Sequence, residues 1–126
     1  MVHFEECHWK MLGYSGEVVS CNNDGPVCIC FDDSDENNPA LVAFIGGKLA
    51  IHWADRTEGD MRNSVISHLA DCLGSWVYQY TDVTIKNWAK EQFIEGSPVT
   101  VPKCGTMEWW PALRETHQRF NTICIQ

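Results

Sequence analysis

The chain contains 126 residues, of which 44% are hydrophobic, and its formal net charge is −8. This length suits one domain with a sizeable core, so we predict a single domain over residues 1–126. The acidic balance excludes sequence-independent binding to nucleic-acid backbones, which needs clustered lysine and arginine. The apolar runs are far too short to cross a membrane.

The amino-terminal residues, MVHFEECHWK, lack the basic and then apolar layout of a secretory signal peptide. A cytoplasmic location is therefore slightly favoured. A mature secreted chain that carries an added methionine would show the same features, so the sequence leaves the compartment open.

The seven cysteines are an odd number and show no paired spacing typical of a zinc finger. We expect them mainly as small buried apolar residues, with one or more free thiols. A metal-linked or redox-active protein that uses Cys28, Cys30 and Cys104 is the alternative.

The first half of the chain indicates short strands separated by turns. We predict strands at residues 2–9, 17–20, 27–31 and 40–45. Residues 22–26 (NNDGP) are typical of a tight turn, so the second and third strands are expected to form a hairpin. The acidic loop at residues 32–38 lacks the glycine and glutamate positions of a calcium-binding loop.

The middle of the chain predicts a short helix over residues 48–55 and a long helix over residues 58–73. Thr57 is the expected amino-terminal cap and Gly74 the expected end of the long helix. Helical spacing assigns an apolar core stripe to Met61, Val65, Ile66, Leu69, and Cys72 or Leu73. His52 and His68 are expected at the surface or on a helix flank.

The last third predicts a long strand over residues 76–85, a short helix that begins at 109–111 and a terminal strand over residues 120–126. The order of strands and helices along the whole chain predicts an α+β fold.

Several short motifs follow one another in the order found in a known family. They are 13–16 (GYSG), 38–47 (NPALVAFIGG), 56–57 (RT), 86–88 (KNW), 95–98 (EGSP), 103–105 (KCG) and 112–114 (ALR). This series over about 110 residues resembles the flavin-dependent amine oxidases, the monoamine oxidase family. The resembling part is their substrate domain, without the FAD-binding domain.

The resemblance implies a mostly antiparallel mixed sheet backed by helices, one face of which forms walls of an apolar amine cavity. It also implies roles for particular positions. The substrate-binding positions would be Val19, Ile29, Phe31, Phe44 and Trp88. Trp88 and Ser97 would be cofactor-binding positions near the flavin, although covalently flavinylated members carry cysteine where this chain has Ser97.

The glycine-rich fingerprint G-x-G-x-x-G, which cradles a dinucleotide pyrophosphate, is absent from these 126 residues. We therefore expect no cofactor for this chain alone and no amine oxidation by it alone, although the family uses FAD. The expected function is a non-catalytic module that binds an apolar small molecule or self-associates as a homodimer. The alternative is a subunit that oxidises amines together with an FAD-binding partner chain.

Overall fold

The structure, a computed structural model, describes residues 1–21, 25–94, 103–114, 116–117 and 122–123. The chain forms two compact units, Met1–Asn87 and Trp88–Gln126, and each is described by itself. The prediction of one domain over the whole chain stays a prediction.

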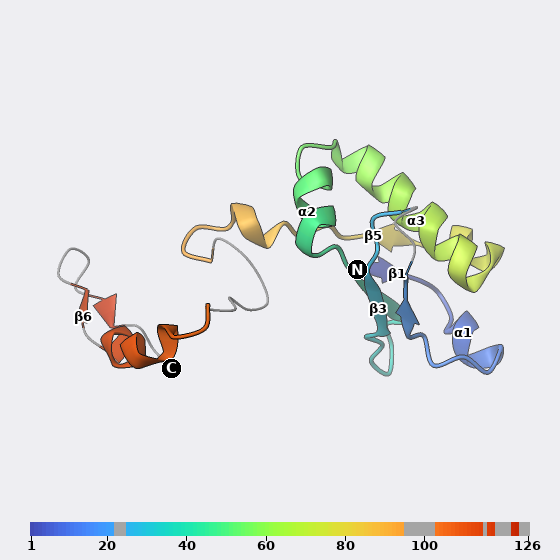
Figure 1. The fold of residues 1–126 in the computed structure, drawn as a ribbon. Helices are drawn as coiled ribbons and strands as arrows, with labels where there is room; N and C mark the ends of the chain where they lie inside the picture. The colour runs from blue at the N-terminus through green and yellow to red at the C-terminus, as the bar shows by residue number, and fades with distance from the viewer. Residues whose placement is uncertain (22–24, 95–102, 115, 118–121, 124–126) are drawn as a thin grey trace. The chain divides into compact units, whose positions relative to one another are not determined.

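The first unit is built on a five-stranded sheet in which every recorded pairing is antiparallel, so the α+β class is confirmed and the expected mixed sheet is not (Figure 1). Its strand order is β2-β3-β4-β1-β5. The strands are β1 (Val2–His3), β2 (Val18–Val19), β3 (Ile29–Asp32), β4 (Ala40–Phe44) and β5 (Asp82–Val83). The predicted hairpin of the second and third strands is confirmed, since Val18 pairs with Cys30 and Val19 with Ile29.

The long helix α3 (Glu58–Leu73) covers one face of this sheet. The Thr57 side chain accepts a hydrogen bond from the Asp60 backbone N–H at 3.1 Å, and Gly74 follows the last turn, as the sequence predicts. Val65, Ile66 and Leu69 of the helix pack with buried residues of the strands. Burial of these side chains contributes hydrophobic stabilisation to the unit.

The short helix α2 (Gly47–Trp53) precedes α3 and agrees with the predicted helix at residues 48–55. Leu49 and Trp53 are partly buried, whereas Ile51 is 78% exposed. Ile51 lies two residues from each of the others, and a helix with 3.6 residues per turn points such a residue toward a different side.

A tryptophan-rich corner replaces much of the first predicted strand. Only Val2 and His3 pair as strand, and α1 (His8–Met11) follows. The Trp9 ring is fully buried, in edge-on contact with Phe4, and Trp76 lies against both rings. Burying the large Trp9 ring in this cluster favours a helical turn over continued strand pairing.

The predicted strand at residues 76–85 is also shorter than expected. Residues Ser75–Gln79 form the 3₁₀ helix η1, and only Asp82 and Val83 pair in the sheet. The Trp76 indole N–H donates to the carbonyl oxygen of Leu73 at 2.8 Å, and the Val77 N–H donates to the carbonyl oxygen of Gly74 at 3.2 Å. These bonds continue a helical path past the end of α3.

The second unit contains the 3₁₀ helices η2 (Trp88–Lys90) and η3 (Thr106–Arg114) and a two-stranded sheet. Strand β6 (Thr116–His117) pairs antiparallel with β7 (Thr122–Ile123). The short helix expected at 109–111 therefore falls within η3, and β7 lies within the expected terminal strand. Within the described part of the chain, no helix combines the length and apolar character required for a membrane span.

An ion pair ties the end of β3 to α1 in the tryptophan-rich corner. Lys10 Nζ lies 2.8 Å from Asp32 Oδ2, and the Ser34 hydroxyl and backbone N–H both donate to Asp32 Oδ1, at 2.6 and 3.0 Å. Partial burial opposes ionisation of Asp32, but the hydrogen bonds from Lys10 and Ser34 outweigh it and lower its pKa from 3.8 to about 2.

The low pKa of Asp32 predicts acid-sensitive stability. A carboxylate with a lowered folded-state pKa contributes stability that is present above pH 3.8 and is lost as the pH falls through about 2. Substitution Asp32→Asn should lower the free energy of unfolding at neutral pH by about 1–2 kcal/mol and flatten this acid dependence. Urea unfolding from neutral to low pH measures both effects. Asp33→Asn, at an exposed neighbour, is the control, and equal stability losses in the two variants would contradict the assignment.

Candidate functional site

The candidate site is the face of the sheet opposite α3, which we call the open apolar face. The antiparallel register pairs Ile29 with both Val19 and Phe44, and pairs Phe31 with Val42. Residues paired across strands, and residues two apart along a strand, project from the same face. The open apolar face therefore carries Val19, Ile29, Phe31, Val42 and Phe44.

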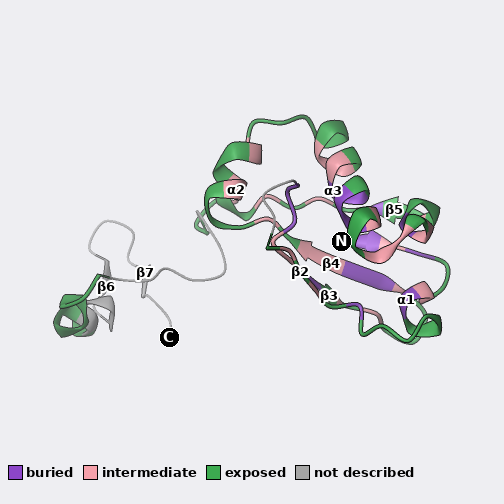
Figure 2. Cartoon of the chain, turned by 45° about the vertical axis from the view of Figure 1, so that its right-hand side comes forward, coloured by how far each residue is buried: buried purple, intermediate pink, exposed green. Residues whose placement is uncertain are grey.

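The alternate residues of the same strands project into the core. Cys30 and Leu41 are fully buried, and Val18 and Ala43 pack against the core cluster that contains the α3 residues. Figure 2 shows the change along β4, from buried residues at its start to an exposed residue at its end. Both sets of alternate residues are thus apolar, but a helix covers only one of them.

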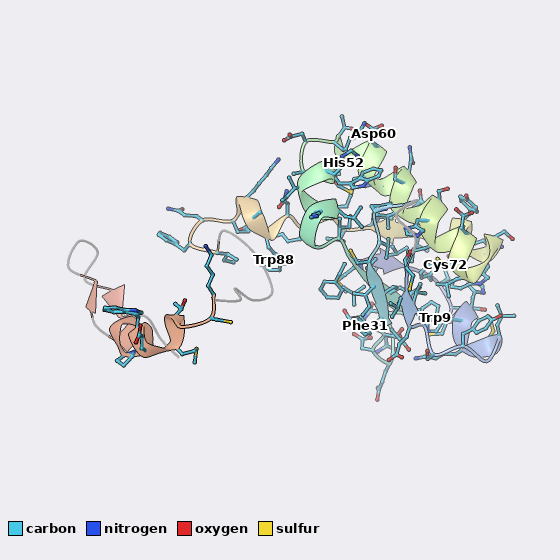
Figure 3. All side chains as sticks on the ribbon, viewed as in Figure 1. Trp9, Phe31, His52, Asp60, Cys72 and Trp88 are labelled. Atoms are coloured by element: carbon cyan, nitrogen blue, oxygen red, sulfur yellow. The ribbon has the colours of Figure 1, made fainter. Side chains whose placement is uncertain are left out.

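Exposure on the open apolar face is high for side chains of this kind. Val19 is 71% exposed, Phe44 44% and Phe31 38%. Phe31 projects from β3 (Figure 3), and its ring meets the Phe44 ring edge-on, with the centroids 6.0 Å apart. Edge-on ring pairs are favourable, so the two phenylalanines form a defined apolar surface.

The side chains of this surface offer apolar contact. None of its five side chains carries a titratable or nucleophilic group. The face can attract the hydrocarbon part of a ligand through removal of apolar surface from water. Contiguous exposed apolar surface is uncommon on monomeric proteins, which makes this face a candidate interaction surface.

The structure brings together four of the five predicted substrate-binding positions: Val19, Ile29, Phe31 and Phe44. Trp88 belongs to the second unit, where it begins η2 and is 47% exposed. Ser97 lies outside the described residues. Val42 was not predicted, although its position two residues before Phe44 on the same strand was a sufficient signal.

The described residues do not fit the pyrophosphate of FAD. The first turn of α3 carries Glu58 and Asp60, whose negative charges repel phosphate at a helix amino terminus. The Gly46-Gly47 turn leads into α2, a helix of only seven residues. The strand before this turn, β4, pairs antiparallel with its neighbours β1 and β3. A flavin nucleotide therefore needs other protein to hold its phosphates.

The cysteines in the described ranges give no support to a metal or redox site. No group of three or more histidine, cysteine, aspartate or glutamate side chains is gathered there. Burial raises the pKa of the Cys30 thiol to about 12, so this group stays protonated and unreactive at neutral pH. Cys28 Sγ accepts a hydrogen bond from the Gly46 N–H at 3.3 Å. Cys104 lies in the second unit and is exposed.

His68 has a different position from the one predicted. Instead of lying at the surface, its side chain is only 8% exposed and packs beneath the β2–β3 hairpin. The position lies seven residues after Met61 and three after Val65, which places it within the same helical stripe. The spacing thus contained the signal, but the polar residue type favoured the wrong side of the helix.

Comparison with known proteins agrees with the motif series. Residues 1–123 match the family model described as flavin containing amine oxidoreductase. The chain is 31% identical over 110 residues to the probable flavin-containing monoamine oxidase A of Dictyostelium discoideum, covering 81% of this chain and 24% of that protein. It is 33% identical over 100 residues to the flavin-containing amine oxidase A of Equus caballus, covering 76% and 19%.

The fold also resembles that of a solved oxidase. A structure of wild-type putrescine oxidase bound to putrescine superposes with a TM-score of 0.74 at 18% identity, covering 88% of this chain and 25% of that one. The chain thus spans about a quarter or less of the length of these relatives.

The open apolar face predicts binding of a fluorescent apolar dye such as 8-anilinonaphthalene-1-sulfonate. The double substitution Phe31→Ser/Phe44→Ser should remove most of the dye fluorescence, because it removes both rings of the face. The free energy of unfolding should change by about 1 kcal/mol or less, because both side chains are partly solvated.

Tyr78→Ser provides the matched control, because Tyr78 is an exposed aromatic residue, 57% exposed, on η1. Dye titration and urea unfolding measure the two effects. Equal loss of fluorescence in the Tyr78 variant would show that the dye does not report on the open apolar face.

Proposed function

The chain belongs to the family of flavin-containing amine oxidoreductases, and from this premise we propose that it is a substrate-domain portion that acts as a binding module. Its ligand is an amine with a substantial hydrocarbon part, which lies against the open apolar face. By itself the module binds without oxidising. The observation that carries the proposal is the apolar, uncovered face at Val19, Ile29, Phe31, Val42 and Phe44.

The proposed binding mode follows from the chemistry of the face. The flat Phe31 and Phe44 rings lose little conformational entropy when they bury a hydrocarbon or aromatic group. None of the five side chains carries a charge, so they contact the ligand through its apolar end. A wall of this kind selects for size and shape and discriminates poorly among head groups.

The described residues offer no phosphate cradle, which supports the non-catalytic part of the proposal. Amine oxidation needs an electron acceptor, which a flavin supplies when it is bound. The described residues do not fit that cofactor, and the sequence lacks the dinucleotide fingerprint. This chain's own contribution is therefore to bind the apolar part of the amine and to exclude water from that side.

A second candidate function is a subunit of an active oxidase, in which another chain holds FAD over the same face. The family membership favours it. In that assembly the open apolar face would be covered by the partner, and in the isolated module by the ligand or by a second copy of the chain. These assemblies differ in molecular mass and in flavin absorbance, so the two measurements distinguish them.

The binding proposal predicts that an arylalkylamine binds the purified chain in isothermal titration calorimetry with a negative heat-capacity change, the mark of apolar burial. Phe31→Ser/Phe44→Ser should weaken binding by about tenfold or more, whereas Tyr78→Ser should not. Equal affinity for the wild type and the double variant would overturn the proposal.

The non-catalytic part has its own test. After incubation with FAD and gel filtration, the protein should show no flavin absorbance between 300 and 500 nm, and the mixture should form no peroxide from the amine. A retained flavin band with peroxide formation would establish the oxidase function instead. Light scattering on the same sample gives the mass, and a dimer that no longer binds the amine would assign the face to self-association.

A further inference from the structure

His68 connects α3 to both arms of the hairpin that forms part of the open apolar face. The Val27 backbone N–H donates to His68 Nδ1 at 3.2 Å, and Ser20 Oγ lies 3.1 Å from His68 Nε2. Ser20 directly follows β2, and Val27 lies two residues before β3. The ring thus holds the end of one arm and the beginning of the other.

These contacts define the protonation state of the ring. Because a backbone N–H can only donate, Nδ1 must accept, and the neutral imidazole then carries its hydrogen on Nε2. Nε2–H consequently donates to the Ser20 hydroxyl oxygen. The doubly protonated ring has a hydrogen on Nδ1 as well, which opposes the Val27 N–H and breaks that bond.

The surroundings are shaped to the ring. A Cβ atom at Gly25 would overlap the imidazole of His68, so the close approach of hairpin and helix requires glycine there. Pro26 and Val27 are fully buried beside it. A hollow of about 170 Å³ opens next to the ring, lined by Gly25, Pro26, Trp53, Ser64, Ser67, His68 and Asp71.

Among the described residues that line the hollow, the charge comes from α3. Asp71 is the charged residue in the described lining, on the same helix face as His68, and the hairpin and α2 contribute uncharged residues to that lining. The hydrogen bond from the Val27 N–H can form only while His68 Nδ1 carries no proton.

We propose that His68 is a positioning residue for the open apolar face: its neutral form fixes the β2–β3 hairpin on α3 and thereby places Val19 and Ile29 in register with the Phe31–Phe44 pair. Protonation releases the Val27 side of the hairpin and loosens that part of the face. The inference rests on the proposed binding function, because the affinity of the face is what the hairpin position controls.

The test uses three substitutions in the full chain. His68→Leu fills the site without any hydrogen bond. His68→Asn retains an acceptor near Nδ1, and His68→Gln retains a donor near Nε2. His52→Gln is the matched control, because His52 is an exposed histidine on the neighbouring helix α2. Arylalkylamine affinity and amide hydrogen exchange of Val27 are measured across the pH range in which the His68 ring titrates by NMR.

In the wild type, amine affinity and Val27 protection should fall together as His68 gains its second proton. His68→Leu should weaken binding by about fivefold or more and abolish this shared pH dependence, whereas His68→Asn should recover most of the Val27 protection. Nitrogen NMR shifts should show Nδ1 unprotonated in the neutral ring.

The inference would be overturned if His68→Leu kept the wild-type amine affinity and the wild-type Val27 amide exchange. It would also be overturned if that variant kept the wild-type pH dependence. If His68→Leu does not fold, the wild-type titration and the Asn and Gln variants decide the question. Failure of the binding function itself is distinguishable: the amine would not bind the wild type at neutral pH, while the exchange and nitrogen NMR measurements would still report on the hairpin.

Discussion

The structure depends on a sheet with two apolar faces and a single long helix to cover one of them. Side chains alternate across a strand, so each strand must place half of its residues on either side. On β3 and β4, Cys30 and Leu41 face the core beneath α3, while Phe31 and Phe44 face away from it. Strands that are apolar on both sides are expected where both faces are covered. The uncovered face is therefore the feature of this unit that requires a functional explanation.

The second constraint is the attachment of the hairpin. Strands β2 and β3 share only two paired positions, and β2 is an edge strand of two residues. A further backbone bond, from the Ser20 N–H to the Cys28 carbonyl oxygen at 3.0 Å, extends this short ladder, and additional contacts fix its side chains more firmly. His68 supplies hydrogen bonds to both arms, and Gly25 permits the close approach. A buried polar residue thus acts on the apolar face through the backbone of the hairpin.

Features with a strong local signal were predictable from the sequence. The stripe around Leu69 and the Thr57 cap located α3, and strand patterns located β3 and β4. The motif series indicated the family, and four positions transferred from it lie together on the open apolar face. The predictions that failed concern features that depend on contacts between residues distant in the sequence. The rings of Phe4 and Trp9 gather in one corner with the ring of Trp76, which is distant in the sequence, and helical turns replace strand pairing there. The role of His68 required knowing that a backbone N–H from the hairpin reaches its ring.

The most direct measurement of the central claim is a map of amide and methyl NMR shifts on titration with an arylalkylamine. The account predicts that the perturbed signals cluster at Val19, Ile29, Phe31, Val42 and Phe44, with little change along the solvent face of α3. Perturbations that instead gather at the hollow between Tyr14 and Leu73, or that appear nowhere, would contradict it.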